Sequence, residues 1–193
     1  KFVVWMVDKG ELCDQAYDAF KTVFSARGRQ DTSLKLHVFY GNNPKNLYDT
    51  IENALDESQS FSTSVIIASI GSLDVICKNQ KNESNDEASL RQLGKNSSII
   101  VIDEAHHAIA DSYTRVLTGI RQKIQNKDGT ETTVKHNDGL GFQFGNKEKH
   151  PEHTRLLGLT ATPFRRESDD SLNKESERLR GRFHHNFFCP YLE

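Results

Sequence analysis

The sequence predicts an α/β fold with a mostly parallel sheet flanked by helices. Residues 98–102 include three isoleucines and one valine and lead directly into Asp103 and Glu104. A continuous apolar run of this length is typical of a parallel strand that is buried on both faces. Residues 2–7 form another apolar run, followed by a turn and then by apolar residues at helical spacing. A strand, a turn and a helix in succession form the unit from which α/β sheets are built.

The other elements follow from the same periodicities. Apolar residues alternate through residues 34–40, which predicts a strand that ends at a Gly-Asn-Asn-Pro turn. The polar run at residues 78–94 predicts a solvated loop. We further expect strands at residues 65–68, 156–159 and 183–192, and helices over residues 12–24, 45–57, 113–120 and 167–180.

Residues 121–154 predict an inserted loop or hairpin. The pairs Asp128-Gly129 and Asp138-Gly139 are hairpin-turn signals, and residues 132–134 and 140–144 are candidate short strands. A decorated surface loop is the simpler interpretation of this segment, although its place in the chain leaves a functional insertion open.

Composition limits the possible functions. The 193 residues suffice for one α/β domain or part of one, and the formal charge of -2 excludes a global basic surface for nucleic acid. Any nucleic-acid contact must therefore be local. The three cysteines, Cys13, Cys77 and Cys189, lack C-x-x-C spacing and suit a reduced intracellular protein. No apolar run reaches the length of a membrane span, so we expect a protein with no membrane partner.

Asp103 and Glu104 are the strongest candidates for chemistry. Two adjacent carboxylates at the end of a buried strand do not both stay ionised without a cation or hydrogen-bond donors. Open α/β sheets bind their ligands at the carboxyl ends of the strands. A magnesium-bound nucleotide is the partner that this arrangement favours.

Two segments resemble a known family. The sequence Asp-Glu-Ala-His at residues 103–106, and Leu-Thr-Ala-Thr-Pro at residues 159–163, resemble motifs II and III of superfamily 2 helicases. The longer string DEAHHAIADSYTRVL is similar to the branch that contains restriction-enzyme translocase subunits and Rad25-like helicases. Both motifs follow a strand-like run and occur in the family's order, which a chance tetrapeptide would not do.

The resemblance implies a RecA-like fold and roles for particular residues. It implies that Asp103 holds Mg²⁺, usually through water, that Glu104 activates water, and that His106 links the nucleotide to motif III. Thr160, Ala161 and Thr162 would form that motif, which couples hydrolysis to movement. ATP and Mg²⁺ are the implied cofactors.

The resemblance also implies nucleic-acid contacts at two other strand ends. Lys9 and Gln15 match the family's motif Ia, and Ser69 and Gly71 match the segment after motif Ib. The alternatives carry about equal weight. Lys9 and Gln15 are also ordinary exposed residues, and Ser69 is an ordinary start to a helix.

A phosphate-binding loop of the G-x-x-x-x-G-K-[ST] type is absent, since the sole Gly-Lys pair, Gly94-Lys95, is followed by asparagine. We therefore expect a partial first helicase lobe, cut from a longer chain and inactive as an ATPase by itself. The resemblance implies a second RecA-like lobe as partner, DNA rather than RNA as the nucleic acid, and a bacterial cytoplasmic location.

Three other functions compete with this interpretation. One is a non-catalytic module that binds nucleic acid or protein, and another is a magnesium-dependent nuclease that uses Asp103 and Glu104. The nuclease is disfavoured because the usual extra acids and lysine are not recognisable. Zinc binding at His150 and His153, or at the histidines beside Cys189, lacks the usual ligand pattern.

Overall fold

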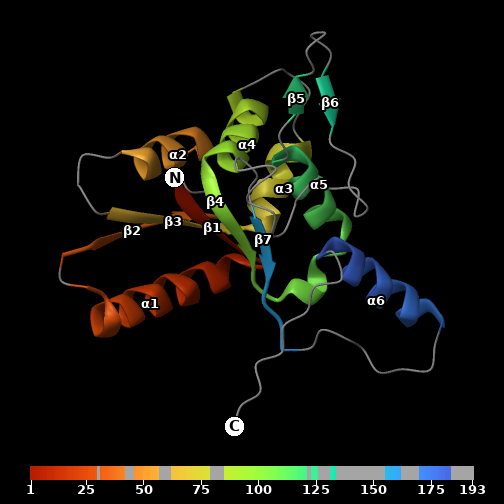
Figure 1. Cartoon of the computed structure of the whole chain (residues 1–193), viewed down its shortest axis with the longest axis horizontal. Coiled ribbons are helices and arrows are strands. Elements are labelled where there is room, and N and C mark those ends of the chain that lie inside the picture. Colours follow the sequence, from red (N-terminus) through yellow and green to blue (C-terminus); the bar gives the residue numbers. More distant parts are fainter. Residues whose placement is uncertain are drawn as a thin grey trace.

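The computed structural model describes residues 1–29, 31–41, 46–56, 62–78, 85–120, 123–125, 131–133, 155–161 and 170–183. Figure 1 shows the elements found there in chain order. They are β1 (Phe2–Val7), α1 (Gly10–Arg27), β2 (Ser33–Phe39), α2 (Leu47–Leu55), β3 (Ser62–Ser69), α3 (Ile70–Lys78), α4 (Asn85–Asn96), β4 (Ser97–Ile102), the 3-10 helix η1 (Ala105–His107), α5 (Asp111–Ile120), β5 (Lys123–Gln125), β6 (Glu131–Thr133), β7 (Arg155–Gly158) and α6 (Asp170–Arg182).

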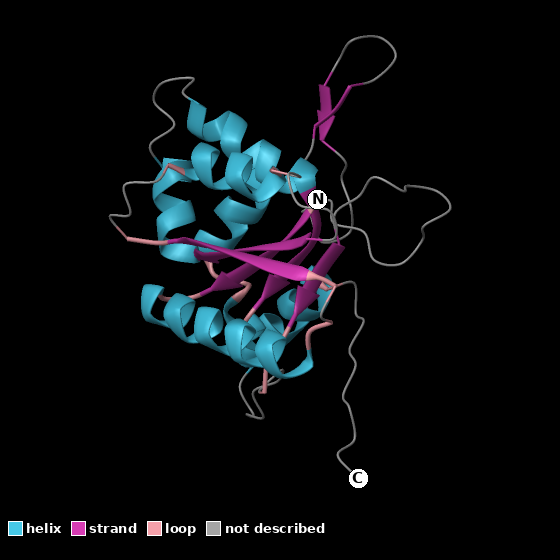
Figure 2. Ribbon diagram, turned by 90° about the vertical axis from the view of Figure 1, so that its left-hand side faces the viewer, coloured by secondary structure: helices cyan, strands magenta, loops and turns pink. Residues whose placement is uncertain are grey.

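Five strands form one parallel sheet in the order β2-β3-β1-β4-β7. Val4 of the central strand β1 lies opposite Ile66 of β3 and Ile100 of β4. Helix α1 covers one face of the sheet, and helices α2 to α5 cover the other (Figure 2). The predicted α/β, RecA-like fold with a mostly parallel sheet is confirmed.

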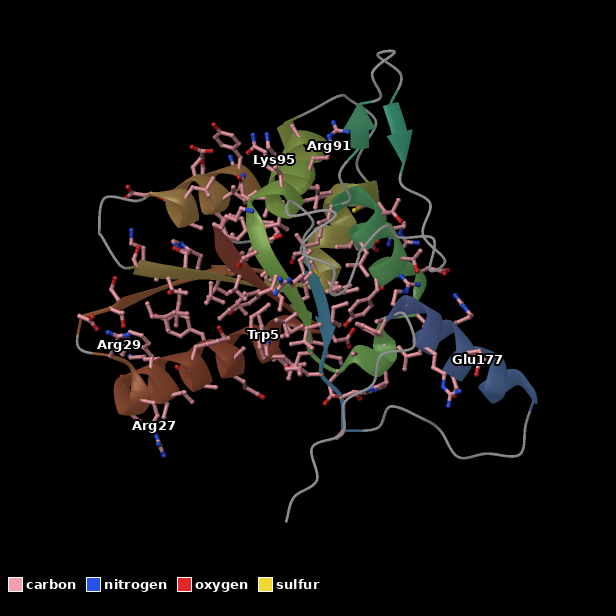
Figure 3. The ribbon with its side chains drawn as sticks, viewed as in Figure 1. Trp5, Arg27, Arg29, Arg91, Lys95 and Glu177 are labelled. Atoms are coloured by element: carbon pink, nitrogen blue, oxygen red, sulfur yellow. The ribbon has the colours of Figure 1, made fainter. Side chains whose placement is uncertain are left out.

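Strand β1 is packed on both faces, which explains why its apolar run contains no polar residue. Phe2, Val4 and Met6 pack with the core under helices α2 to α5, whereas Val3 and Trp5 pack on the side of α1. The Trp5 ring meets the ring of Phe20 edge-on, with centroids 5.1 Å apart (Figure 3). Each fully buried aliphatic side chain of this kind contributes about 1.5–3 kcal/mol. Both faces therefore anchor the central strand.

The loop predicted at residues 78–94 is wrong in its second half, because residues from Asn85 onward form α4. Leu90 and Leu93 are completely buried and lie one helical turn apart. Arg91 and Lys95 lie on the side away from the sheet (Figure 3). The helix has two buried leucines in an otherwise polar sequence, so tertiary burial rather than local periodicity decides its structure.

Gly94 belongs to this helix and has a packing role. A Cβ atom there would lie 2.1 Å from the carbonyl oxygen of Ile120 at the end of α5. The absence of a side chain lets α4 approach α5 closely. This explains the glycine of the Gly-Lys pair without reference to phosphate.

The segment between α5 and β7 contains a hairpin. Strands β5 and β6 pair antiparallel, with Ile124 opposite Thr132. The strand expected at residues 132–134 is thus found one residue earlier, and its partner is β5. The candidate strand at residues 140–144 and the hairpin-turn pairs lie outside the described residues, as does almost all of the last strand expected at residues 183–192.

An ion-pair cluster ties α3 to α5. The Asp74 carboxylate is buried and accepts hydrogen bonds from Arg115 Nε at 2.7 Å and Arg115 Nη2 at 3.1 Å. Lys78 Nζ lies 2.7 Å from the same carboxylate. The hydrogen bonds from Arg115, helped by Lys78, lower the pKa of Asp74 below its usual value.

Two cysteines are free thiols: Cys13 is buried in the core on the α1 side of the sheet, and Cys77 is half-buried. Burial raises the pKa of Cys13 to about 12 and that of Cys77 to about 11. Cys189 lies outside the described residues. Among the helices that the structure describes, none is long and apolar enough to span a membrane.

Candidate functional site

The carboxyl ends of all five parallel strands meet at one edge of the sheet. The connections diverge there between two neighbouring strands: α1 leads from β1 toward β2 over one face, and α5 leads from β4 toward β7 over the other. Open α/β sheets bind ligands at such a switch point. Asp8 follows β1, and Asp103 and Glu104 follow β4. The fold therefore brings these acids to the position where a ligand is expected.

Backbone hydrogen bonds from both neighbouring strand ends hold the acidic segment. The amide of Asp103 donates to the carbonyl of Met6 at 2.9 Å. On the other side, the amide of Ala105 donates to the carbonyl of Leu159 at 2.8 Å, and the amide of Leu159 donates to that of Ile102 at 2.8 Å. The segment is thus an ordered extension of the sheet.

Glu104 adopts a left-handed backbone conformation, with φ 51° and ψ 51°. Among the described residues other than glycine, it is the one with a positive φ. Its amide donates to Asp103 Oδ1 at 3.0 Å. A residue in this region costs on the order of 1–3 kcal/mol, and such strain clusters at functional sites. The turn leaves the Glu104 side chain 48% exposed at the strand edge.

His106 lies between Glu104 and Thr160, a residue of the segment that resembles motif III. Its Nδ1 atom lies 3.2 Å from Glu104 Oε2 and 3.1 Å from Thr160 Oγ1. One ring nitrogen therefore faces a carboxylate and a hydroxyl. With a hydrogen on Nδ1 the ring donates to the Thr160 hydroxyl, and without one it accepts from that hydroxyl. Thr160 is therefore a hydrogen-bond partner of His106 in either tautomer.

Gly158 permits the close approach of motif III to the acidic segment. A Cβ atom at Gly158 would lie 2.7 Å from Cβ of Ala105 and 2.5 Å from Cζ of Phe183. Thr160 is half-buried and Ala161 is exposed, while Thr162 lies outside the described residues. The two sequence motifs thus meet through backbone, side-chain and packing contacts.

The residues expected to face nucleic acid lie at the ends of neighbouring strands. Val7 of β1 pairs with Ser69 of β3, so the turn that carries Lys9 lies beside the start of α3. Lys9 and Gln15 are exposed, and Gly71 faces open space. Ser69 differs, because its hydroxyl is buried, accepts from the amide of Ser72 at 3.3 Å and lies 2.9 Å from Ser72 Oγ. Ser69 therefore serves the start of α3, as the alternative interpretation has it.

Sequence reasoning missed Asp8 and Tyr113 as neighbours of the acidic segment. Tyr113 is completely buried on α5, and its hydroxyl has no hydrogen-bond partner. Burial, and then the charges of Asp8, Asp103 and Glu104, raise the pKa of Tyr113 above its ordinary value. Its helical spacing indicated only a core residue, and no local signal distinguishes a core tyrosine from one beside a site.

The acids do not by themselves form a metal cage. Within the described part of the chain, no group of three His, Cys, Asp or Glu side chains is arranged to hold a metal ion. Mg²⁺ in nucleotide-dependent enzymes is usually held by one or two carboxylates together with substrate phosphates and water. A strand-end carboxylate such as Asp103, with further negative charge nearby, fits that kind of binding.

Comparison with known proteins gives one family match. A family model described as type III restriction enzyme, res subunit, matches residues 1–165. No curated protein matches the chain. The matched segment includes the ends of β4 and β7, where the structure brings Glu104, His106 and Thr160 together.

Proposed function

Because this chain belongs to the family of type III restriction enzyme res subunits, which has a superfamily 2 helicase-like domain, we propose that the natural protein is an ATP-dependent DNA translocase. The observation that carries the proposal is the contact of His106 with both Glu104 and Thr160. It joins the predicted water-activating residue to the predicted coupling motif at the carboxyl edge of the sheet.

Asp103 is the residue proposed to hold Mg²⁺, through water. Its place at the end of β4, an interior strand of the sheet, with Oδ1 fixed by the amide of Glu104, supports this assignment. Mg²⁺ bound to ATP would neutralise the phosphate charge that develops during transfer. The role of the protein in this step would be to hold the Asp103 carboxylate in a fixed position at the end of β4.

Glu104 is the residue proposed to orient and deprotonate the attacking water. Its strained turn and half-exposed carboxylate support the proposal, since the group is both fixed at its backbone and reachable. His106 Nδ1 lies 3.2 Å from this carboxylate, and a movement of the imidazole away from it would leave the carboxylate free for water. A change at the nucleotide would reach Thr160, in the proposed motif III, through the same imidazole.

The proposed DNA contacts lie along the same edge of the sheet. Lys9 is exposed and forms no ion pair with a described residue, so its ammonium is available to a phosphate. Gln15 and the backbone at Gly71 are exposed beside it. Ser69 would act through the start of α3 that it caps, since its hydroxyl is already engaged.

We further propose that residues 1–193 alone do not hydrolyse ATP at a measurable rate, because the sequence has no phosphate-binding loop. The missing amides and lysine remove several charge-assisted hydrogen bonds, each worth about 1.5–3 kcal/mol. A second RecA-like lobe would complete the site in the natural protein. An ATPase activity of this stretch that Glu104→Gln abolishes would contradict the proposal.

The test of the main proposal is ATP turnover by the natural full-length protein with single-stranded DNA, duplex DNA and RNA. We expect turnover that duplex or single-stranded DNA stimulates and that Glu104→Gln reduces by about a thousandfold or more. The matched control is Glu52→Gln, an exposed residue on α2, which leaves turnover unchanged. Stimulation by RNA and not by DNA would show that the protein moves along RNA.

Absence of turnover under every condition would favour a non-catalytic binding module instead. Magnesium-dependent cleavage of plasmid DNA without ATP would favour a nuclease. ATP turnover and DNA cleavage are both measured on the same protein preparations. The experiment therefore distinguishes a translocase from a binding module and from a nuclease.

A further inference from the structure

The turn after β2 links the two strand ends proposed to face DNA, although it belongs to neither. Tyr40 and Gly41 follow β2, which is separated from β1 by β3. Tyr40 contacts α1, which begins after β1, and Gly41 contacts α3, which begins after β3. The turn therefore spans three neighbouring strand ends.

Tyr40 contacts α1 in two ways. Its phenol oxygen lies 2.8 Å from both carboxylate oxygens of Asp14. Its ring packs on Gly10, where an added Cβ atom would lie 2.7 Å from Cδ2 of the ring. Gly10 is the first residue of α1 and follows Lys9 directly. The ring and the hydroxyl thus fix both the start of the helix and its next turn.

Gly41 provides the connection to α3. Its backbone has a φ of +62°, a conformation that glycine adopts without strain. Its amide donates to Ser72 Oγ at 2.9 Å, and Ser72 Oγ in turn lies 2.9 Å from Ser69 Oγ. A chain of hydrogen bonds therefore runs from the turn after β2 to the residue at the end of β3.

We infer that Tyr40 is a positioning residue for DNA binding, which holds the Lys9 turn through its contacts with Gly10 and Asp14. The inference rests on the proposed function, since it assigns Tyr40 no contact with DNA. The phenol also occupies the carboxylate of Asp14, which lies next to Gln15. Loss of the hydroxyl would therefore free the first turns of α1, which follow Lys9.

The experiment uses the natural full-length protein and a fluorescein-labelled duplex oligonucleotide. Tyr40→Phe keeps the ring and removes the hydrogen bond, so we expect DNA binding to weaken about fivefold, with basal ATP turnover and the KM for ATP unchanged. The KM for DNA in stimulated turnover should rise by the same factor. Tyr48→Phe is the matched control, because Tyr48 is a partly exposed tyrosine on α2.

The salt dependence of binding separates positioning from general stability. Lys9→Ala should reduce the slope of log Kd against log salt by about one phosphate contact. Tyr40→Phe should reduce this slope as well. When it is combined with Lys9→Ala, it should change the affinity for DNA little beyond the effect of Lys9→Ala alone. A merely structural role would lower Tm and leave the slope of the folded protein unchanged.

Three results would overturn the inference. If wild type binds DNA and Tyr40→Phe binds with the affinity and slope of Tyr48→Phe, Tyr40 has no positioning role and the proposed function stands. If wild type neither binds DNA nor responds to it, the proposed function fails and the inference fails with it. Additive effects of Tyr40→Phe and Lys9→Ala would likewise exclude action through Lys9.

Discussion

The Nδ1 atom of His106 lies 3.1 Å from the hydroxyl oxygen of Thr160, although 54 residues separate them in the chain. The two residues follow neighbouring parallel strands, β4 and β7, which bring the ends of two sequence motifs together. Glu104 shares the same imidazole nitrogen at 3.2 Å. The imidazole is thus placed to transmit a change at the carboxylate to the hydroxyl.

Thr160→Val tests this connection. Valine keeps the shape of threonine and removes the hydroxyl, so His106 loses one of its two neighbours. In the natural protein, we expect DNA-stimulated ATP turnover to fall by about tenfold, with basal turnover less affected. Thr63→Val, at an exposed position of β3, is the control and should behave as wild type. Equal stimulation in both variants would show that the hydroxyl does not couple the motifs.

Gly158→Ala tests the close approach between β7 and the acidic segment. The added methyl would collide with Ala105 and Phe183, and overpacking of this kind costs about 1–3 kcal/mol of the free energy of unfolding. Urea denaturation measures the loss. Gly181→Ala is the control, because nothing lies within 4 Å of the added methyl and its helix favours alanine. If Gly158→Ala is as stable as Gly181→Ala, the segments move apart without cost.

Tyr113→Phe tests the orphaned hydroxyl. Phenylalanine fills the same space without a buried polar atom that lacks a partner. We therefore expect the free energy of unfolding to stay constant or to rise by up to about 1 kcal/mol. Chemical denaturation gives the value. A clear loss of stability would show that the hydroxyl is hydrogen-bonded in solution, for example to a water beside Asp8 and Asp103.

Asp74 predicts a pH dependence of stability. The hydrogen bonds from Arg115, and then from Lys78, lower its pKa in the folded protein below its ordinary value. The ionised carboxylate therefore contributes stability that is present above the unfolded pKa and is lost as the pH falls through the lower folded pKa. We expect Asp74→Asn to be less stable than wild type at neutral pH, and the difference to shrink below about pH 4.

Urea denaturation across this pH range measures the difference. Glu52→Gln, which removes an exposed carboxyl on α2, should remain close to wild type throughout. A difference between Asp74→Asn and wild type that does not change with pH would show that packing, and not the charge of Asp74, links α3 to α5.

Local sequence predicted most of the strands because burial on both faces leaves a direct mark. The isoleucine run before Asp103 and the apolar run at residues 2–7 are the two central strands, β4 and β1. The helix α4 was missed because two leucines are too few to show a period, and α4 is a helix only because both are buried against its neighbours. The hairpin was located, but its pairing was not, since register depends on the partner strand.

In the candidate site too, some features were predicted from the sequence and others were set by the tertiary structure. Two carboxylates at the end of a buried strand are a local feature, so the residues themselves predicted a site at Asp103 and Glu104. The resemblance to superfamily 2 helicases added His106 and Thr160 to that prediction. The left-handed turn of Glu104 and the bridge from Tyr40 to Asp14 could not be read from the sequence. Each depends on which strands are neighbours, and that order is set by the packing of helices on both faces of the sheet.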